Sequence, residues 1–119
     1  MKALALASLL ALGASAACAG EQPSLECNAG AVDRVFGGTH WTVQACDDGK
    51  HLAIVTKPGN PAAPFTFIVE MSDDGLFVSG DGTGDKAASD AAYADLEKLS
   101  DAEVRALFAQ ARAGSRGRH

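Results

Sequence analysis

The sequence predicts an α+β fold: a small antiparallel β-meander of about four strands, followed by one or two C-terminal helices packed on the sheet, with one disulfide. Three observations lead to this prediction. In the middle of the chain, runs of β-forming residues are separated by short segments rich in Gly, Asp and Pro. From Asp85 to Arg112 there is no Gly or Pro, and Ala is the commonest residue, as is typical of helices. Cys27 and Cys46 stand at a spacing that suits one disulfide loop.

The N-terminal segment has the composition of a secretory signal peptide. Lys2 supplies a positive start, residues 3–13 form an uncharged run rich in Ala and Leu, and small residues follow. This run is shorter than the roughly 20 apolar residues of a membrane-spanning helix. We therefore expect residues 1–19 to be removed, leaving a periplasmic or secreted protein. In the alternative, Cys18 carries a lipid and the protein is a membrane-anchored lipoprotein.

The mature chain is expected to form one domain, residues 20–112, followed by a flexible basic tail, residues 113–119. In an oxidising compartment the pair Cys27 and Cys46 is expected to form a structural disulfide, worth on the order of 3 kcal/mol. Without Lys2, nine Lys and Arg residues face fifteen Asp and Glu residues. This acidic balance argues against nucleic acid or anionic lipid as a partner and suits a cationic protein.

The strands are predicted from alternation and from the turns between them. In the first turn, Gly49 can adopt a positive φ, as tight hairpins require. The second separating segment contains three prolines, which lack the amide donor of a regular strand. The predicted strands are Trp41–Cys46, His51–Lys57, Phe65–Met71 and Leu76–Gly80, separated by Asp47–Lys50, Pro58–Pro64 and Ser72–Gly75. The earlier segment Gly30–Gly38 fits either a short helix or an edge strand.

Two apolar stripes at helical spacing follow the last strand. Ser100 and Glu103 form a capping box, which indicates that a second helix begins there. A single helix bent at Ser100 is the alternative. The stripes consist of Ala88, Ala92, Leu96 and Leu99, and of Val104, Leu107, Phe108 and Ala111.

The stretch VSGDGTGDKAAS, Val78–Ser89, invites a phosphate-binding interpretation. The P-loop pattern fails, because Asp85 stands where the second glycine is needed and Ala87 replaces the Ser or Thr. We therefore expect a strand-to-helix joint, in which glycines allow a sharp turn and Asp85 caps the helix.

Calcium is the other ligand that this stretch suggests. The spacing of an EF-hand loop fails, because Lys86 and Ala92 occupy the positions of its glycine and its last acid. A looser site built from Asp81 and Asp85 with a third aspartate from the turn at Asp73 and Asp74 stays open at this point.

Catalytic patterns are few. There is no G-x-S-x-G and no H-E-x-x-H in the chain. His40 and His51, with the acidic turns, could serve a small metal-dependent or hydrolytic module, and this is the alternative function. No cofactor is predicted, and the balance favours a protein that is not an enzyme.

A non-catalytic role in protein binding is the leading functional hypothesis. The chain is small, is expected to be exported, and is expected to have a disulfide and acidic exposed turns. These features suit an inhibitor, an immunity-type factor or an accessory factor of the envelope. The expected contact surface is Asp47, Asp48 and Lys50, with nearby Trp41 or His51.

The stretch ACDDGKHLAIV, Ala45–Val55, resembles the cysteine-glycine hairpin of small periplasmic lysozyme inhibitors, which are disulfide-linked β proteins, often lipoproteins. The resemblance covers about a tenth of the chain. The second, serine- and glycine-rich loop of those proteins has no counterpart here, and the helical C-terminus does not suit their barrel.

Overall fold

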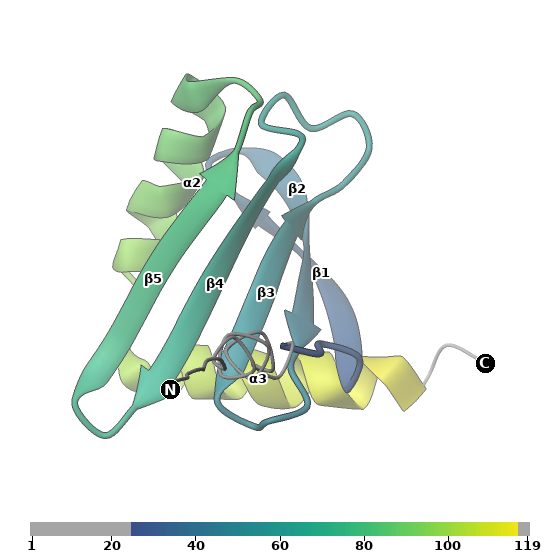
Figure 1. The fold of residues 1–119 in the computed structure, drawn as a ribbon, viewed down its shortest axis with the longest axis vertical. Helices are drawn as coiled ribbons and strands as arrows, with labels where there is room; N and C mark the ends of the chain where they lie inside the picture. The colour runs from purple at the N-terminus through teal and green to yellow at the C-terminus, as the bar shows by residue number, and fades with distance from the viewer. Residues whose placement is uncertain (1–24, 117–119) are drawn as a thin grey trace, which may run out of the picture.

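The fold is a five-stranded antiparallel meander followed by two helices (Figure 1). The structure is a computed structural model and describes residues 25–116; the expected signal peptide, Cys18 and the end of the tail lie outside this range. The strands follow the sequence order across the sheet. The elements are β1 Gly30–Phe36, β2 Thr39–Ala45, β3 His51–Thr56, β4 Phe65–Ser72, β5 Gly75–Gly82, α2 Lys86–Glu97 and α3 Asp101–Arg116. The predicted α+β class is confirmed.

The fifth strand is β1, the segment whose sequence fitted either a helix or an edge strand. It pairs with β2 along its whole length, from Gly30 opposite Ala45 to Phe36 opposite Thr39. A turn at Gly37 and Gly38 joins the two strands. Pairing with β2 therefore selects the strand, which the local pattern alone did not decide.

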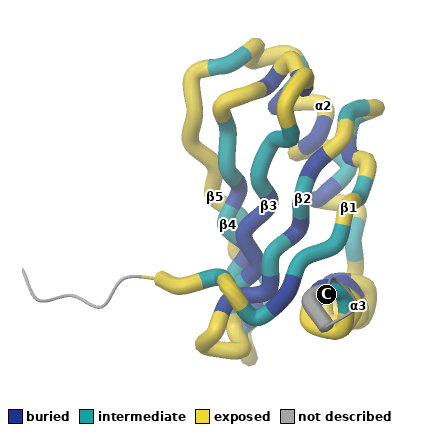
Figure 2. Tube along the Cα trace, turned by 90° about the vertical axis from the view of Figure 1, so that its right-hand side faces the viewer, coloured by how far each residue is buried: buried dark blue, intermediate teal, exposed yellow. Residues whose placement is uncertain are grey.

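Both helices lie on the same side of the sheet (Figure 2). Alternate residues of β2 and β4 point into this helical layer, and Trp41 in β2 is fully buried. Its indole nitrogen donates hydrogen bonds to the Phe36 carbonyl at 3.2 Å and the Thr39 hydroxyl at 3.0 Å. The helices contribute both predicted stripes, with Ala92, Leu96, Val104, Leu107, Phe108 and Ala111 buried.

The two helices are separate, as the capping box predicted. The Ser100 amide donates to the Glu103 carboxylate at 2.8 Å, and the Glu103 amide donates to the Ser100 hydroxyl at 3.1 Å. Helix α3 continues to Arg116, past the expected boundary at residue 112. Close packing of Gly114 on the backbone of Ala31 accompanies this extension, because a Cβ at Gly114 would lie 2.3 Å from the Ala31 oxygen.

Candidate functional site

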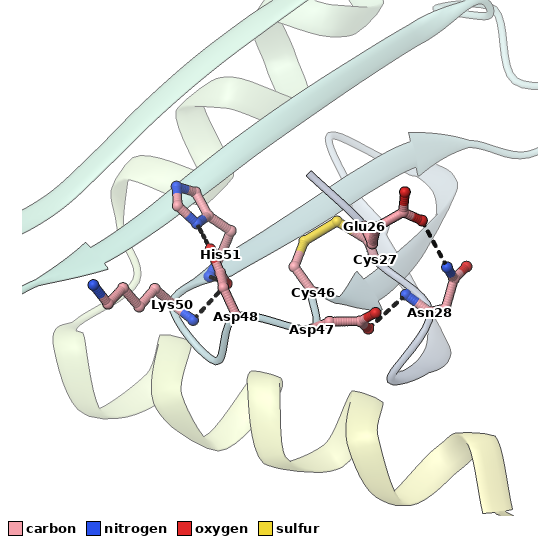
Figure 3. Close-up of a disulfide and its surroundings, with 8 residues drawn as sticks. All are labelled: Glu26, Cys27, Asn28, Cys46, Asp47, Asp48, Lys50 and His51. Carbon is pink, nitrogen blue, oxygen red and sulfur yellow. Dashed lines mark hydrogen bonds and ion pairs between the residues drawn. A yellow bond between two sulfur atoms is a disulfide. The ribbon is translucent and has the colours of Figure 1, made fainter. Parts of the chain in front are cut away.

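One carboxylate, that of Asp48, makes three contacts within the β2–β3 hairpin (Figure 3). One of its oxygens accepts hydrogen bonds from the amides of Lys50, at 2.8 Å, and His51, at 3.1 Å. Its other oxygen lies 2.6 Å from Nδ1 of His51. Gly49 has a φ of 73°, as the tight turn requires. The hairpin is therefore a fixed loop with an ion pair at its base when His51 is protonated.

The same contacts set the pKa of Asp48. Partial burial acts to raise this pKa, but it is outweighed by the Lys50 amide, by the hydrogen bond and charge of the His51 ring, and by the His51 amide. The pKa of Asp48 consequently lies below its ordinary value of 3.8. The carboxylate is ionised across the physiological pH range.

The disulfide ties a second segment to this hairpin. Cys27 and Cys46 are bonded, as predicted, and hydrogen bonds on either side extend the contact (Figure 3). The Asp47 amide donates to the Glu26 carbonyl at 2.7 Å. The Asn28 amide donates to the Asp47 carboxylate at 3.2 Å. Asp47 is thus exposed yet held from both its backbone and its side chain.

A second acidic turn lies beside the first. Because His51 is opposite Glu70 in the β3–β4 register, the β4–β5 turn lies at the same end of the sheet as the hairpin. The Met71 amide donates to the Lys50 carbonyl at 2.8 Å, which joins the hairpin turn to the end of β4 just before the second turn. Asp73 and Asp74 at its tip are exposed.

Three segments therefore meet in one acidic surface, which we call the acidic end. They contribute six carboxylates against one lysine and one histidine. The acidic end comprises Glu26, Asp47, Asp48, Lys50, His51, Glu70, Asp73 and Asp74. The sequence placed Asp47 and Asp48 in one turn and Asp73 and Asp74 in another, but the sheet register brings the two turns together. The participation of Glu26 and Asn28 follows only from the disulfide partner of Cys46.

Two residues that the sequence suggested for function, Trp41 and His40, do not belong to this surface. Trp41 was expected near the contact surface, but it is fully buried under the helices. The alternation of the β2 sequence could have predicted this burial, because Trp41, Val43 and Ala45 fall on one face of the strand. His40 and His51 lie near opposite ends of the β2–β3 pair, so they cannot converge on one metal ion as the alternative function requires.

The glycine-rich joint between β5 and α2 has a packing explanation. A Cβ at Gly82 would lie 2.2 Å from the Pro64 oxygen, and one at Gly84 would lie 2.0 Å from the Ala62 oxygen. At Gly80 it would meet the Phe65 ring at 2.7 Å. The glycines therefore allow β5 to approach the aromatic residues of β4 and the proline-rich loop.

Asp85 has the capping role that the sequence predicted. Its carboxylate accepts the Ala87 amide at 3.0 Å at the start of α2. Asp73 and Asp74 stand at the opposite end of β5, away from Asp81, so the looser calcium site is not assembled.

Comparisons with known proteins do not assign a family. No protein-family model, curated protein or solved structure matches this chain. Across residues 25–116, no helix is long and apolar enough to cross a membrane. Over the same residues, His, Cys, Asp and Glu side chains do not gather in any group of three or more that could hold a metal ion. The function is therefore inferred from the geometry of the acidic end.

Proposed function

We propose that this chain is a small exported, non-catalytic protein that binds a cationic protein of the cell envelope through its acidic end. In this role it acts as an inhibitor, an immunity-type factor or an accessory factor. The observation that carries the proposal is that three segments, which together bear six carboxylates, are held at one end of the sheet by hydrogen bonds and a disulfide.

Rigidity favours recognition by this surface. Asp48 fixes the hairpin through two amides and an imidazole, and the Asn28 amide holds Asp47. A loop that is already ordered loses little conformational entropy on binding. Concentrated negative charge speeds the approach of a positively charged partner and disfavours acidic partners.

The disulfide supports export. Disulfides persist mainly in oxidising compartments such as the periplasm and the extracellular space. The signal-peptide composition of residues 1–19 supports the same location. Both a released protein and one anchored through Cys18 are compatible with a partner in the envelope.

The decisive experiment changes charge without disturbing the hairpin. Asp73→Lys combined with Asp74→Lys reverses two exposed charges while leaving Asp48 in place. The control, Asp33→Lys with Glu97→Lys, makes the same change in net charge at exposed positions on β1 and α2, outside the acidic end.

Parent, variant and control serve as baits for an envelope extract at low and at raised salt. We expect the parent and the control to retain a basic protein that raised salt releases, and the acidic-end variant to lose it. Identical capture by all three baits would show that the acidic end is ordinary solvated surface. Circular dichroism of each bait establishes that the fold is intact.

A further inference from the structure

We propose that the edge strand β5 pairs with β5 of a second copy of this chain, giving a two-fold dimer with a continuous ten-stranded sheet. This inference concerns a different surface from the acidic end and does not depend on the proposed partner.

Strand β5 is the edge of the sheet that the described elements leave open. It stands last in the strand order, and β4 is the only described element with which it makes extensive contact. At the other edge, α3 packs along β1 and α2 also contacts it. In Figure 1, β5 forms one lateral border of the sheet. An edge strand of eight residues presents unpaired backbone groups that favour pairing with another strand.

The hairpin geometry identifies the backbone groups that point outward. The two-residue turn Asp73–Asp74 makes Ser72 and Gly75 a hydrogen-bonded pair. The backbone groups of odd-numbered residues of β5 consequently form hydrogen bonds with β4. The same alternation continues just beyond the strand, where the Thr83 amide donates to the Pro64 carbonyl at 3.0 Å. The amides and carbonyls that face outward belong to Leu76, Val78, Gly80 and Gly82.

The side chains of β5 are self-complementary along this edge. On the helical face, Leu76 and Val78 are only half-buried, whereas Gly80 and Gly82 carry no side chain. Beside these glycines lies an open hollow of about 430 Å³, lined by Phe65 and Ser89 and by the charged residues Asp81, Lys86 and Asp90. On this face the strand thus carries bulky apolar side chains in its first half and no side chains in its second half.

A two-fold axis through Val78 brings these features together. In this antiparallel register, Leu76 of each copy lies opposite Gly80 of the other, which carries no side chain to oppose it. On the open face, Phe77 lies opposite Ser79 of the other copy. Because the two-fold axis repeats each contact, residues that fit in one half of the interface also fit in the other half.

The neighbouring registers are less favourable. Moving the axis to Ser79 places the exposed Phe77 opposite Asp81 of the other copy. Moving it to Phe77 brings Asp73 opposite Asp81, and like charges facing each other across strands are destabilising. A register that pairs an even-numbered residue with an odd-numbered one would put side chains on the wrong face of the sheet. The axis through Val78 avoids all three conflicts.

The first test is molecular mass by light scattering, at several concentrations, on protein purified from the envelope fraction. We expect the mass of two chains for the parent and of one chain for Leu76→Lys, because a charged lysine on an edge strand opposes pairing with another strand. Val35→Lys is the matched control: it adds the same charge at an exposed apolar position on β1, and it should stay dimeric. A monomeric parent, or a dimer that Leu76→Lys leaves intact, overturns the proposal.

The second test does not rely on the folding of the lysine variant. Residues opposite each other in a hydrogen-bonded antiparallel pair have Cα atoms about 5.5 Å apart, within disulfide range. Val78→Cys should therefore form a covalent dimer on mild oxidation, whereas His40→Cys, exposed on β2, should not. Failure of Val78→Cys to cross-link, or equal cross-linking of both variants, contradicts the two-fold register.

Salt distinguishes this association from capture of a cationic partner. Two copies that each carry a net charge near −6 without Lys2 repel, so screening should strengthen the dimer. Capture through the acidic end should instead weaken with salt. Each surface can thus fail its own test while the other passes.

Discussion

Replacing Gly84 by alanine tests whether the glycine-rich joint exists for packing. A Cβ there would lie 2.0 Å from the Ala62 oxygen and 2.6 Å from the Ala63 oxygen. Both atoms belong to the backbone of the proline-rich loop, so no side-chain rotation relieves the clash. Overpacking of this kind costs about 1–3 kcal/mol. Reduced freedom of the unfolded chain offsets only about 0.4–1 kcal/mol of that loss.

The net loss expected for Gly84→Ala is about 1–2 kcal/mol, which corresponds to roughly 4–8 °C in melting temperature per kcal/mol for a domain of this size. Gly80→Ala should cost less, because the added methyl meets the edge of the Phe65 ring, a side chain that can shift. Urea unfolding followed by fluorescence of Trp41, the single tryptophan, measures both variants. Equal stability of Gly84→Ala and the parent would refute the packing explanation, as would a larger loss at Gly80.

Three further predictions concern the disulfide, a tyrosine and the hairpin. Native protein should resist thiol alkylation at Cys27 and Cys46, and reduction should lower its stability by on the order of 3 kcal/mol; two reactive thiols in native material would contradict the bond. The pKa of Tyr93, the single tyrosine, is raised by a hydrogen bond from its hydroxyl to Glu97 and by the charge of that carboxylate, so Glu97→Gln should move the ultraviolet titration to lower pH. Because the folded-state pKa of Asp48 is lowered, its stabilisation is present above about pH 4 and is lost as the pH falls through that pKa. The stability difference between parent and Asp48→Asn should shrink over that range, and a difference that persists at lower pH would show that ionisation is not its source.

Features that depend on a few neighbouring residues can be predicted from the sequence. The hairpin at Gly49 and the capping box of Ser100 and Glu103 were predicted, because each is closed by hydrogen bonds within one short segment. The disulfide was predicted because the chain offers two cysteines once Cys18 is removed or lipidated. The alternating and helical periodicities gave the α+β class for the same reason.

Which segments meet follows from the packing of the whole domain. The strand at Gly30–Phe36 forms because β2 offers it a partner along its whole length, whereas its local pattern suited a helix equally well. Trp41 is buried rather than exposed because the helices cover its face of the sheet. The acidic end likewise depends on the register between β3 and β4, which sets Lys50 beside Met71. Register and layering arise from packing between residues distant in the sequence, and no short stretch of the chain contains that information.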